Sequence, residues 1–497
     1  MRCIQVDALK EKGPFDSFFR TCVGAGRAAE VARKASLDQL REVHEQCGFT
    51  YLRFHGLLHD EMAVYQEDTS GAPVYNWQYV DMVYDEILAC GMKPFVELSY
   101  MPEKLASGTQ HLFWWNANVT PPKDYTRWGE LIRALTAHWT ARYGREEVRT
   151  WLFEVWNEPN HPSFFSGTQE EYFRLYEVTA KAVKSVCGEY KVGGPASAGS
   201  AWVPELIEYC YCNQIPLDFV STHTYSVQSG HFDEFGDQEL FIHQDTDLVS
   251  KDVRMVAEQV RQSPMPCLPV HYTEWSSSYS ARDASHDSYI QASFILYQLK
   301  RIQGNAASMS YWTFSDIFEE TGVPLAPFHG GFGLMNLQGL RKPSFYAYQY
   351  LNRLGPEEIQ NPDPDSFACK SENGVQVLLW EYHRPKQDVC NREYFTRDLR
   401  PKALEPVSLK ITGLAPGRYR MRLYQVGYGV NDVYHDFTEA HFTDLPTQEE
   451  TAKLKKQTSG EAVRSESIQI GPNGTYERLL PMREYDCFLL ELSSETT

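Results

Sequence analysis

An α/β fold is predicted for residues 15–350, because short apolar runs alternate there with longer amphipathic segments. Strands separated by helices of this length indicate a parallel sheet. Eight strand-then-helix units occur over roughly 330 residues, which favours a (β/α)8 TIM barrel over an open, doubly wound sheet. Beyond this region the helical segments give way to strands and turns, so residues 351–497 predict an accessory β-sandwich.

Each predicted barrel strand is a short apolar run. In order along the chain, these runs occupy residues 18–24, 49–56, 93–102, 150–159, 191–197, 217–225, 268–275 and 307–316. Between them, apolar residues recur at helical spacing, most clearly in residues 79–92, 128–144 and 171–186. This alternation is the one that a closed parallel barrel requires.

The accessory sandwich is predicted from strand-like runs at residues 375–385, 407–427 and 485–494, of which the second contains a Pro-Gly turn. Residues 1–14 hold one more apolar run, which we expect to form a strand that joins the sandwich. Residues 446–468 are charged and poor in large apolar side chains. They predict a surface excursion or a subunit contact, and the sequence leaves both open.

Polar and aromatic side chains gather at the ends of six of the predicted barrel strands. In this fold, catalytic groups lie at the carboxyl ends of the strands. The opposite strand ends carry no such collection. The residues concerned are Arg53, His55, Glu97, Asn157, Glu158, His223, Tyr225, Glu274, Trp275, Trp312 and Asp316.

Composition and charge exclude several classes of function. A net charge of −19 argues against binding to a nucleic-acid backbone. No run of about 20 apolar residues could cross a membrane, and no signal peptide is visible. The 11 scattered cysteines and the missing signal favour a cytoplasmic protein with free thiols. Cys210 and Cys212 have no matching second pair, so no metal site is expected.

The stretch VGAGRAAE, with Gly24, Gly26 and Ala29, loosely fits a dinucleotide-binding fingerprint. That motif also needs an acidic residue at the end of the next strand, to hold a ribose. The next predicted strand ends instead with Arg53 and His55. We therefore expect no nucleotide cofactor, and we expect the glycines to let a loop approach the floor of a pocket.

Two glutamates at strand ends suggest a chemistry. Glu158 lies in WNEPN and Glu274 in YTEW, and both would face one pocket in a barrel. Two carboxylates that flank a glycosidic bond are the minimal equipment for glycoside hydrolysis, provided that one is protonated and the other ionised. Glu274 would then need hydrogen-bond donors that keep it charged, for which the candidates are Tyr225, His223 and Arg53.

The residues around Glu158 predict its conformation and its protonation. Pro159 favours an extended backbone at the residue before it, so we expect Glu158 to end a strand. A carboxyl walled by Trp156 and Pro159 would have its pKa raised by desolvation. Glu158 could then protonate the leaving oxygen of a glycoside.

The motifs WNEPN and YTEW resemble the two signatures of the clan A retaining barrel glycosidases. Further stretches narrow the resemblance to glycoside hydrolase family 39 and, within it, to the β-xylosidases: YLRFHG, FWWNANVTPPKDY, STHTY, SYWTFSDIFEETG and PFHGGFGLMNLQGLRKPS. The resemblance implies an exo-glycosidase that releases β-linked D-xylose from the non-reducing end of xylo-oligosaccharides. It also implies that no cofactor is needed and that the protein is a homo-oligomer, such as a tetramer.

The same resemblance implies roles for individual residues. Glu158 corresponds to the acid/base and Glu274 to the nucleophile, as the chemistry above suggests. Asn157 corresponds to the residue that contacts the sugar 2-hydroxyl, and His223 and Tyr225 to residues near the nucleophile. The positions that hold the non-reducing-end sugar correspond to His55, Tyr279, Trp312 and Glu319.

Three residues near these positions need separate mention. Glu320 adjoins Glu319, and the sequence leaves open which of the two points inward. Arg53 is expected to support the site as an ion-pair partner beneath the nucleophile. His161, which follows WNEPN, has no role that the sequence assigns.

Two alternative functions stay open at the level of the sequence. One is a glycosidase of the same mechanism that acts on arabinose, glucose or an iduronate-type uronic acid. A uronidase would need a cation near C6 of the sugar, whereas a xylosidase should block that space. The other is a carbohydrate-binding scaffold without turnover, with the sandwich as its ligand module.

Overall fold

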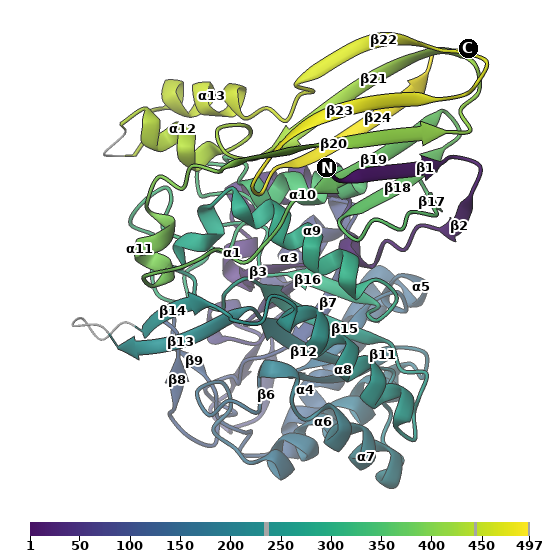
Figure 1. Ribbon diagram of the computed structural model, residues 1–497. Coiled ribbons are helices and arrows are strands. Elements are labelled where there is room, and N and C mark those ends of the chain that lie inside the picture. Colours follow the sequence, from purple (N-terminus) through teal and green to yellow (C-terminus); the bar gives the residue numbers. More distant parts are fainter. Residues whose placement is uncertain (233–237, 442–444, 496–497) are drawn as a thin grey trace.

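The computed structural model describes residues 1–232, 238–441 and 445–495. The larger part of these residues forms a closed barrel of parallel strands surrounded by helices, which confirms the predicted fold class (Figure 1). Each strand pairs with the next along the chain, and the last pairs with the first. The strands are β3 (Cys22–Arg27), β4 (Tyr51–His55), β7 (Lys93–Leu98), β10 (Leu152–Val155), β11 (Lys191–Ser197), β12 (Phe219–Tyr225), β15 (Val270–Ser276) and β16 (Ser308–Tyr311).

One long helix follows each barrel strand. These helices are α2 (Lys34–Cys47), α3 (Gln78–Ala89), α4 (Tyr125–Tyr143), α6 (Gln169–Val186), α7 (Val203–Asn213), α8 (Leu248–Gln262), α9 (Ile290–Ile302) and α10 (Pro343–Asn352). Local sequence fixes where some of them begin. Asp124 caps α4 by accepting hydrogen bonds from two backbone N–H groups, and Thr168 and Glu171 form a capping box on α6.

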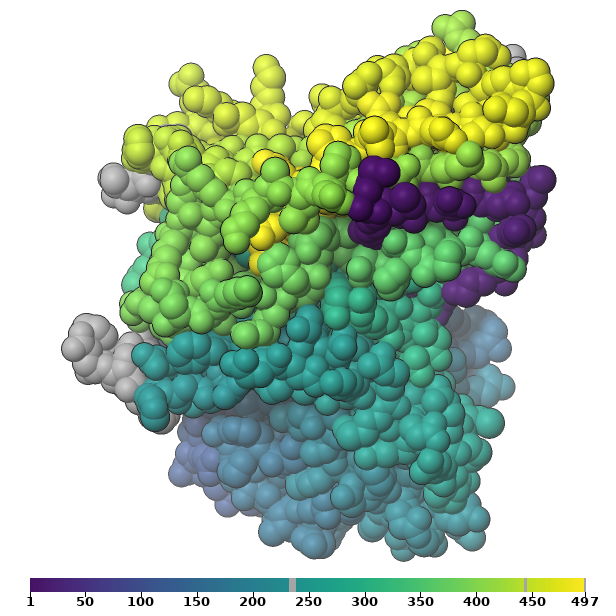
Figure 2. Space-filling model, in the orientation of Figure 1, coloured from purple at the N-terminus to yellow at the C-terminus, as the bar shows by residue number. Residues whose placement is uncertain are grey.

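The accessory region contains two sheets that share one apolar core. The smaller sheet consists of β1 (Cys3–Asp7), β20 (Ala403–Thr412) and β23 (Tyr476–Arg483). The larger sheet has the order β2 (Glu11–Pro14), β17 (Glu357–Ile359), β18 (Ser366–Ser371), β19 (Gly374–Trp380), β24 (Cys487–Ser494), β21 (Gly417–Val426) and β22 (Arg464–Ile470). Figure 2 shows the purple N-terminal segment against the green and yellow C-terminal strands.

The N-terminal residues and the run at 407–427 illustrate how the two sheets connect. Strand β1 pairs in parallel with β20, so the N-terminus lies within the smaller sheet. The run at 407–427 supplies β20 and β21, which belong to different sheets. Gly413, with φ +76°, lies in the turn between them, in a backbone region that favours glycine.

Residues 446–468 are more ordered than a surface excursion. They contain helix α13 (Gln448–Gln457), which begins with a capping box of Thr447 and Glu450, and the first part of β22. Leu454 of α13 is buried against Val433, which begins helix α12 (Val433–Glu439), and against Leu340. Leu454, together with hydrogen bonds to the backbone of Thr458 and Gly460, therefore anchors this charged segment to the protein.

The loops at the carboxyl ends of the barrel strands carry small hairpins. They are β5–β6 (Tyr65–Glu67 and Pro73–Tyr75), β8–β9 (His111–Leu112 and Ala117–Asn118) and β13–β14 (Val227–Phe232 and Gln238–Ile242). Because loops of this face carry the functional side chains of such barrels, these hairpins are placed to shape a site.

Candidate active site

A cavity of about 420 Å³ lies at the carboxyl ends of the barrel strands, which is a size typical of small-ligand sites. Its lining comes from loops and strand ends all around the barrel. The residues are His55, Asn157, Glu158, His161, Phe164, Ala198, Gly199, Tyr225, Val227, Glu274, Tyr279, Trp312 and Glu320. Most of the residues that the sequence proposed for the site are therefore brought together here.

The carboxyl groups of Glu158 and Glu274 face each other in this cavity. An oxygen of one lies within 4.8 Å of an oxygen of the other. Retaining glycosidases hold their two carboxyl groups about 5–5.5 Å apart, and inverting ones about 6.5–9.5 Å. The separation therefore fits double displacement and leaves too little room for an inverting water.

Glu158 leaves strand β10 through a bent backbone. Trp156 has φ +70° and Glu158 has φ +46°, in a region that residues with side chains seldom adopt. The Glu158 N–H donates to the Ala196 carbonyl at 2.8 Å, which fixes the bend. Glu158 follows a strand, as predicted, but the extended conformation expected from Pro159 is wrong.

Burial raises the pKa of Glu158 to about 7. The rise in the pKa of Glu158 agrees with the prediction, but the structure does not place Trp156 against the carboxyl group as predicted. Trp156 lies behind the cavity, where its ring packs edge-on against Tyr100 and Phe165. Desolvation of Glu158 therefore comes from its enclosed position, and Trp156 serves to hold the loop in place.

Arg53 lies fully buried beneath the cavity and connects several strands. Its guanidinium donates to Glu274 Oε1 at 2.8 Å, to Glu154 Oε2 at 2.5 Å and to Asn157 Oδ1 at 2.8 Å. It also pairs with Glu97 at 2.8 Å. These acids hold the pKa of Arg53 well above its ordinary value, against the opposing effect of burial. A permanent cation thus lies in hydrogen-bond contact with the carboxyl group of Glu274.

Tyr225 and His223 contact the catalytic pair from strand β12. The Tyr225 hydroxyl donates to Glu274 Oε2 at 2.7 Å, so each oxygen of Glu274 accepts a hydrogen bond. His223 Nδ1 lies 2.8 Å from Glu158 Oε1 and 3.5 Å from Glu274 Oε2. Burial lowers the pKa of His223 to about 4, so its imidazole is neutral.

One end of the cavity is formed by His55, Trp312 and Glu320. The rings of His55 and Trp312 lie 4.7 Å apart, and His55 Nε2 is 3.5 Å from Glu320 Oε1. Burial disfavours the charge of His55, but Glu97, 2.8 Å from Nδ1, together with Glu320 and Glu274 outweighs burial, and the pKa of His55 rises to about 10. This end therefore offers a cation, an indole and a carboxyl to a bound ligand.

The structure answers the question between Glu319 and Glu320. Glu320 lines the cavity, whereas Glu319 does not. Glu319 turns to the opposite side of the loop and pairs with Arg27 at 3.0 Å and with Arg33 at 2.5 Å. The placement of Glu319 against the sugar is therefore corrected to Glu320, because Arg27 and Arg33 already take up the Glu319 carboxylate.

Two other predicted residues, Asn157 and Tyr279, also line the cavity, one buried and one exposed. Asn157 is buried between Arg53 and the Tyr100 hydroxyl, which its amide approaches at 3.5 Å. Tyr279 is 46% exposed, and its hydroxyl bonds with Ser229 of β13 at 2.8 Å. Asn157 is thus part of the rigid floor, and Tyr279 is part of the rim.

Gly24 and Gly26 of VGAGRAAE allow close packing at the floor of the cavity. A Cβ built on Gly24 would lie 2.3 Å from the Trp312 ring, and one on Gly26 would lie 1.8 Å from Glu30. Real Cβ atoms do not approach so closely, so Gly24 is what allows the indole of Trp312 to lie at the cavity.

A metal could be held by Glu158, His223 and Glu274, the one cluster of possible ligands found within residues 1–232, 238–441 and 445–495. Their contacting atoms are already engaged in the hydrogen bonds given above. The arrangement can work as a proton-transfer and nucleophile pair without an ion.

Sequence reasoning gave no role to Glu154, Thr273 or Phe164. Glu154 accepts hydrogen bonds from Arg53 and from the Thr273 hydroxyl, inside the barrel. The sequence does contain a sign of this role: Glu154 is the one acid within the apolar run LFEV, and a buried carboxylate needs a partner. Phe164 lines the cavity but carries no polar pattern that would distinguish it from core.

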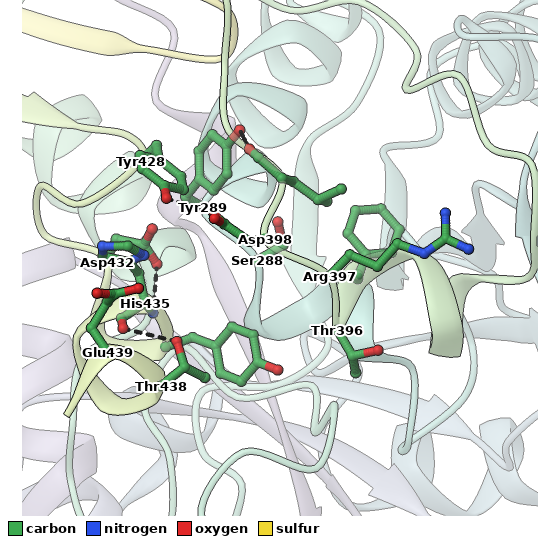
Figure 3. Close-up of a pocket in the computed structure, with 13 residues that line it drawn as sticks. Ser288, Tyr289, Thr396, Arg397, Asp398, Tyr428, Asp432, His435, Thr438 and Glu439 are labelled. Carbon is green, nitrogen blue, oxygen red and sulfur yellow. Dashed lines mark hydrogen bonds between the residues drawn. The ribbon is translucent and has the colours of Figure 1, made fainter. Parts of the chain in front are cut away.

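A second cavity of about 190 Å³ lies between the start of α9, helix α11 (Asn391–Phe395) and helix α12. Figure 3 shows two of its carboxylates, those of Asp398 and Asp432, hydrogen-bonded to neighbouring residues. Asp398 accepts from the Tyr428 hydroxyl at 2.6 Å, and Asp432 accepts from the Gly429 N–H at 3.2 Å and from the His435 N–H, in the first turn of α12, at 3.4 Å. We therefore place the chemistry at the first cavity.

A parallel barrel with two carboxyl groups this close at the carboxyl ends of its strands has the architecture of a retaining glycoside hydrolase. The profile described as "Glycosyl hydrolases family 39" matches residues 2–385. The chain therefore belongs to glycosyl hydrolase family 39, which confirms the resemblance seen in its motifs.

Individual relatives agree with this assignment. The "Beta-xylosidase" of Geobacillus stearothermophilus is 42% identical over 387 residues, which cover 76% of this chain and 77% of the relative. A solved structure described as a monomeric beta-xylosidase from Caulobacter crescentus CB15 is 41% identical, covers both chains fully and has a TM-score of 0.96. Human "Alpha-L-iduronidase" is 21% identical over 413 residues, covering 74% of this chain and 59% of the relative.

Proposed function

We propose that this protein is a retaining exo-β-xylosidase that removes single β-linked D-xylose units from the non-reducing ends of xylo-oligosaccharides. The observation that carries the proposal is the approach of Glu158 and Glu274 to within 4.8 Å in an enclosed cavity. Relatives more than 40% identical over most of the chain bear the name beta-xylosidase, which supports xylose as the sugar.

In the first step, an ionised oxygen of Glu274 attacks the anomeric carbon. The bond from that carbon to the leaving oxygen breaks as Glu158 donates its proton to that oxygen. Arg53 and Tyr225 hold Glu274 in position, each by a hydrogen bond to one of its two oxygens. The products are a shortened oligosaccharide and a covalent glycosyl ester on Glu274.

In the second step, Glu158, now ionised, takes a proton from water, and the water oxygen attacks the anomeric carbon. The ester bond to Glu274 breaks and β-xylose leaves. Both enzyme carboxyls return to their starting protonation. Two inversions at one carbon give net retention.

The charges at the cavity favour a neutral sugar. Its described lining contains no Lys or Arg side chain, whereas a uronidase would need a cation beside C6. The His55 cation, at the end of the cavity formed with Trp312 and Glu320, is already shared between Glu97 and Glu320. A substrate carboxylate placed there would meet the Glu320 carboxyl.

Exo action is supported by how one end of the cavity is closed. The Phe113 ring stacks toward His55 with centroids 6.2 Å apart, and the Trp114 N–H donates to the Glu320 carbonyl at 2.9 Å. The β8–β9 hairpin is thereby tied to the loop that carries Glu320. A chain end fits such a closed site, and a continuing polysaccharide does not.

We also propose a cytoplasmic location, on the scattered cysteines, and a homo-oligomeric state, on the resemblance described above. Among the described helices, none combines the length and apolar character needed to cross a membrane. The Caulobacter relative is described as monomeric, so a monomer is the competing state. Light scattering of the purified protein separates the two by mass.

Replacing Glu158 by Ala tests the assigned roles. The variant should lose turnover of xylobiose by at least about 10³-fold, because an unactivated leaving oxygen needs a proton. It should still form the glycosyl ester from an aryl β-xyloside with a good leaving group. Added azide should then restore turnover and yield the β-xylosyl azide. Azide product of the α configuration, or no rescue, would contradict the scheme.

A panel of aryl glycosides tests the sugar. The β-xyloside should be cleaved at least about tenfold faster than the arabinoside, glucoside and iduronide, as kcat/KM, since a misfitting substituent costs about 1–3 kcal/mol. Tight xylobiose binding without product would instead favour the carbohydrate-binding scaffold.

A further inference from the structure

Thr273 precedes the nucleophile in strand β15 and is buried inside the barrel. In the ladder between β12 and β15, Thr222 pairs with Tyr272 and His223 pairs with Glu274, so Thr273 is the extra residue of a bulge. Adjacent residues of a regular strand point to opposite faces, and a bulge relaxes that alternation. Both Thr273 and Glu274 can therefore serve the interior of the barrel.

Thr273 links the buried charges to His223. Its hydroxyl donates to Glu154 Oε1 at 2.8 Å, and the other oxygen of Glu154 is paired with Arg53. The Thr273 oxygen also lies 3.2 Å from His223 Nε2. Because a hydroxyl has one proton, and Thr273 gives it to Glu154, the oxygen can only accept a hydrogen bond from His223.

This contact selects one tautomer of the neutral imidazole. His223 Nε2 must carry the ring proton, and Nδ1 must present a lone pair. Nδ1 lies 2.8 Å from Glu158 Oε1, which is a hydrogen bond only if Glu158 supplies the proton. The chain of contacts from Arg53 to Glu158 therefore fits a protonated Glu158 and disfavours the carboxylate.

We propose that Thr273 is a positioning residue, which fixes His223 with its proton on Nε2 and thereby holds Glu158 in the proton-donating form. This inference rests on the proposed role of Glu158 as acid/base. Thr273 touches no substrate; it acts through His223. The network couples the cation beneath the nucleophile to the proton on the acid, across strands β4, β10, β15 and β12.

Other charged and titratable groups also face Glu158, and they stay in place in the test below. They are Arg53 and His55 from β4, Glu97 from β7, Tyr225 from β12, Glu274 from β15, Glu320 from the loop after β16, and His161 from its own loop.

The test compares Thr273→Val, which keeps the shape and removes the hydroxyl, with Thr273→Ser, which keeps the hydroxyl. In Thr273→Val, His223 Nε2–H loses its acceptor and the ring can move its proton to Nδ1, where it would favour ionised Glu158. The alkaline limb of kcat/KM for xylobiose should then move down by about one pH unit. Thr273→Ser should restore the wild-type limb.

Thr136→Val is the matched control, because Thr136 is a buried threonine of α4 whose hydroxyl donates to the Ile132 carbonyl of the same helix at 2.8 Å. In Thr136→Val, the alkaline limb of kcat/KM for xylobiose should stay at the wild-type pH. A limb that stays unchanged in Thr273→Val, or moves upward, would overturn the proposal. So would a shift that Thr273→Ser fails to restore.

A second measurement needs neither a variant nor turnover. Nitrogen NMR of the wild-type protein with ¹⁵N-labelled histidine should assign His223 as neutral, with the proton on Nε2 and Nδ1 bare, between pH 5.5 and 6.5. A proton on Nδ1 would overturn the proposal even if Thr273→Val does not fold. If the wild type cleaves another glycoside and no xyloside, the proposed function fails while this tautomer test still stands.

Discussion

Arg53 shows how much of the site depends on a single side chain. It lies at the centre of a fully buried set of carboxylates that includes Glu97, Glu154 and Glu274. Buried ion pairs add little net stability while intact, but removing one partner leaves an uncompensated charge. The fold therefore tolerates these acids only because the cation is present.

Arg53→Met should lower the free energy of unfolding at pH 7 by about 3–5 kcal/mol, because three acids lose their partner. Urea unfolding followed by tryptophan fluorescence measures the change. Arg464→Met is the control: Arg464 is 57% exposed in its pair with Glu466, and its loss should cost less than about 1 kcal/mol. Equal effects of the two substitutions would contradict the role given to the buried network.

The protonation of Glu158 sets a pH limit on activity. Its pKa is raised to about 7 by burial, so the proton-donating form is lost as pH rises through that value. Since kcat/KM follows ionisation in the free enzyme, its alkaline limb for xylobiose should fall near pH 7. An aryl xyloside whose leaving group needs no proton is the control, and its kcat/KM should fall much less. A xylobiose profile that stays flat to about pH 9 would contradict the assignment.

At the scale of elements, the barrel was predictable because its strand-then-helix unit repeats along the sequence. Elements of the accessory region that lack such a repeat were missed. All eight predicted barrel strands are confirmed, because each is an apolar run followed by an amphipathic helix. Strand β22 is polar along most of its length, with the sequence RSESIQI, and so gave no signal. In residues 446–468, charge masked a helix that is held by Leu454.

The site residues also divide into those that regular strands position, which were predictable, and those on irregular loops, which were not. The strand ends placed Glu158, Glu274, His55 and Tyr225 together, because barrel topology brings them to one face. The choice between Glu319 and Glu320 depends on the path of an irregular loop, which no periodic pattern encodes. That loop is oriented by contacts with Arg27 and Arg33, both distant in the sequence.

The loop that carries Glu320 yields a prediction at this scale. Glu319→Gln weakens the ion pairs that tie the loop to Arg27 and Arg33, so Glu320 loses its fixed position. The KM for xylobiose should rise about tenfold with a smaller change in kcat, since misplaced binding groups are costly. Steady-state kinetics measure both constants. The matched variant Glu320→Gln should raise KM as well, and an unchanged KM in Glu319→Gln would refute the anchoring role.

At the scale of the whole molecule, the sandwich has an apolar core of its own, and its larger sheet also packs into the apolar core of the barrel. Phe367, Trp380 and Leu489 of the sandwich belong to the same buried cluster as the barrel helices. Arg353, just after α10, pairs with Glu491 of β24 at 2.9 Å. An interface that is apolar and continuous with the core couples the two parts in folding.

A chain of residues 15–354, without the sandwich, should therefore fail to fold as an independent barrel. It should bind a hydrophobic dye and unfold without a cooperative transition, whereas the full chain should unfold in one step. Urea titration of both proteins measures this. A cooperative transition together with xylobiose turnover in the shorter chain would show that the sandwich is dispensable.

The stereochemistry of the first product tests the central claim most directly, because the close approach of Glu158 and Glu274 permits only double displacement. Proton NMR recorded within the first minutes of an aryl β-xyloside digest separates the two anomers of xylose before they interconvert. We predict that β-xylose appears first and that α-xylose grows in later by mutarotation. Initial release of α-xylose would contradict the account.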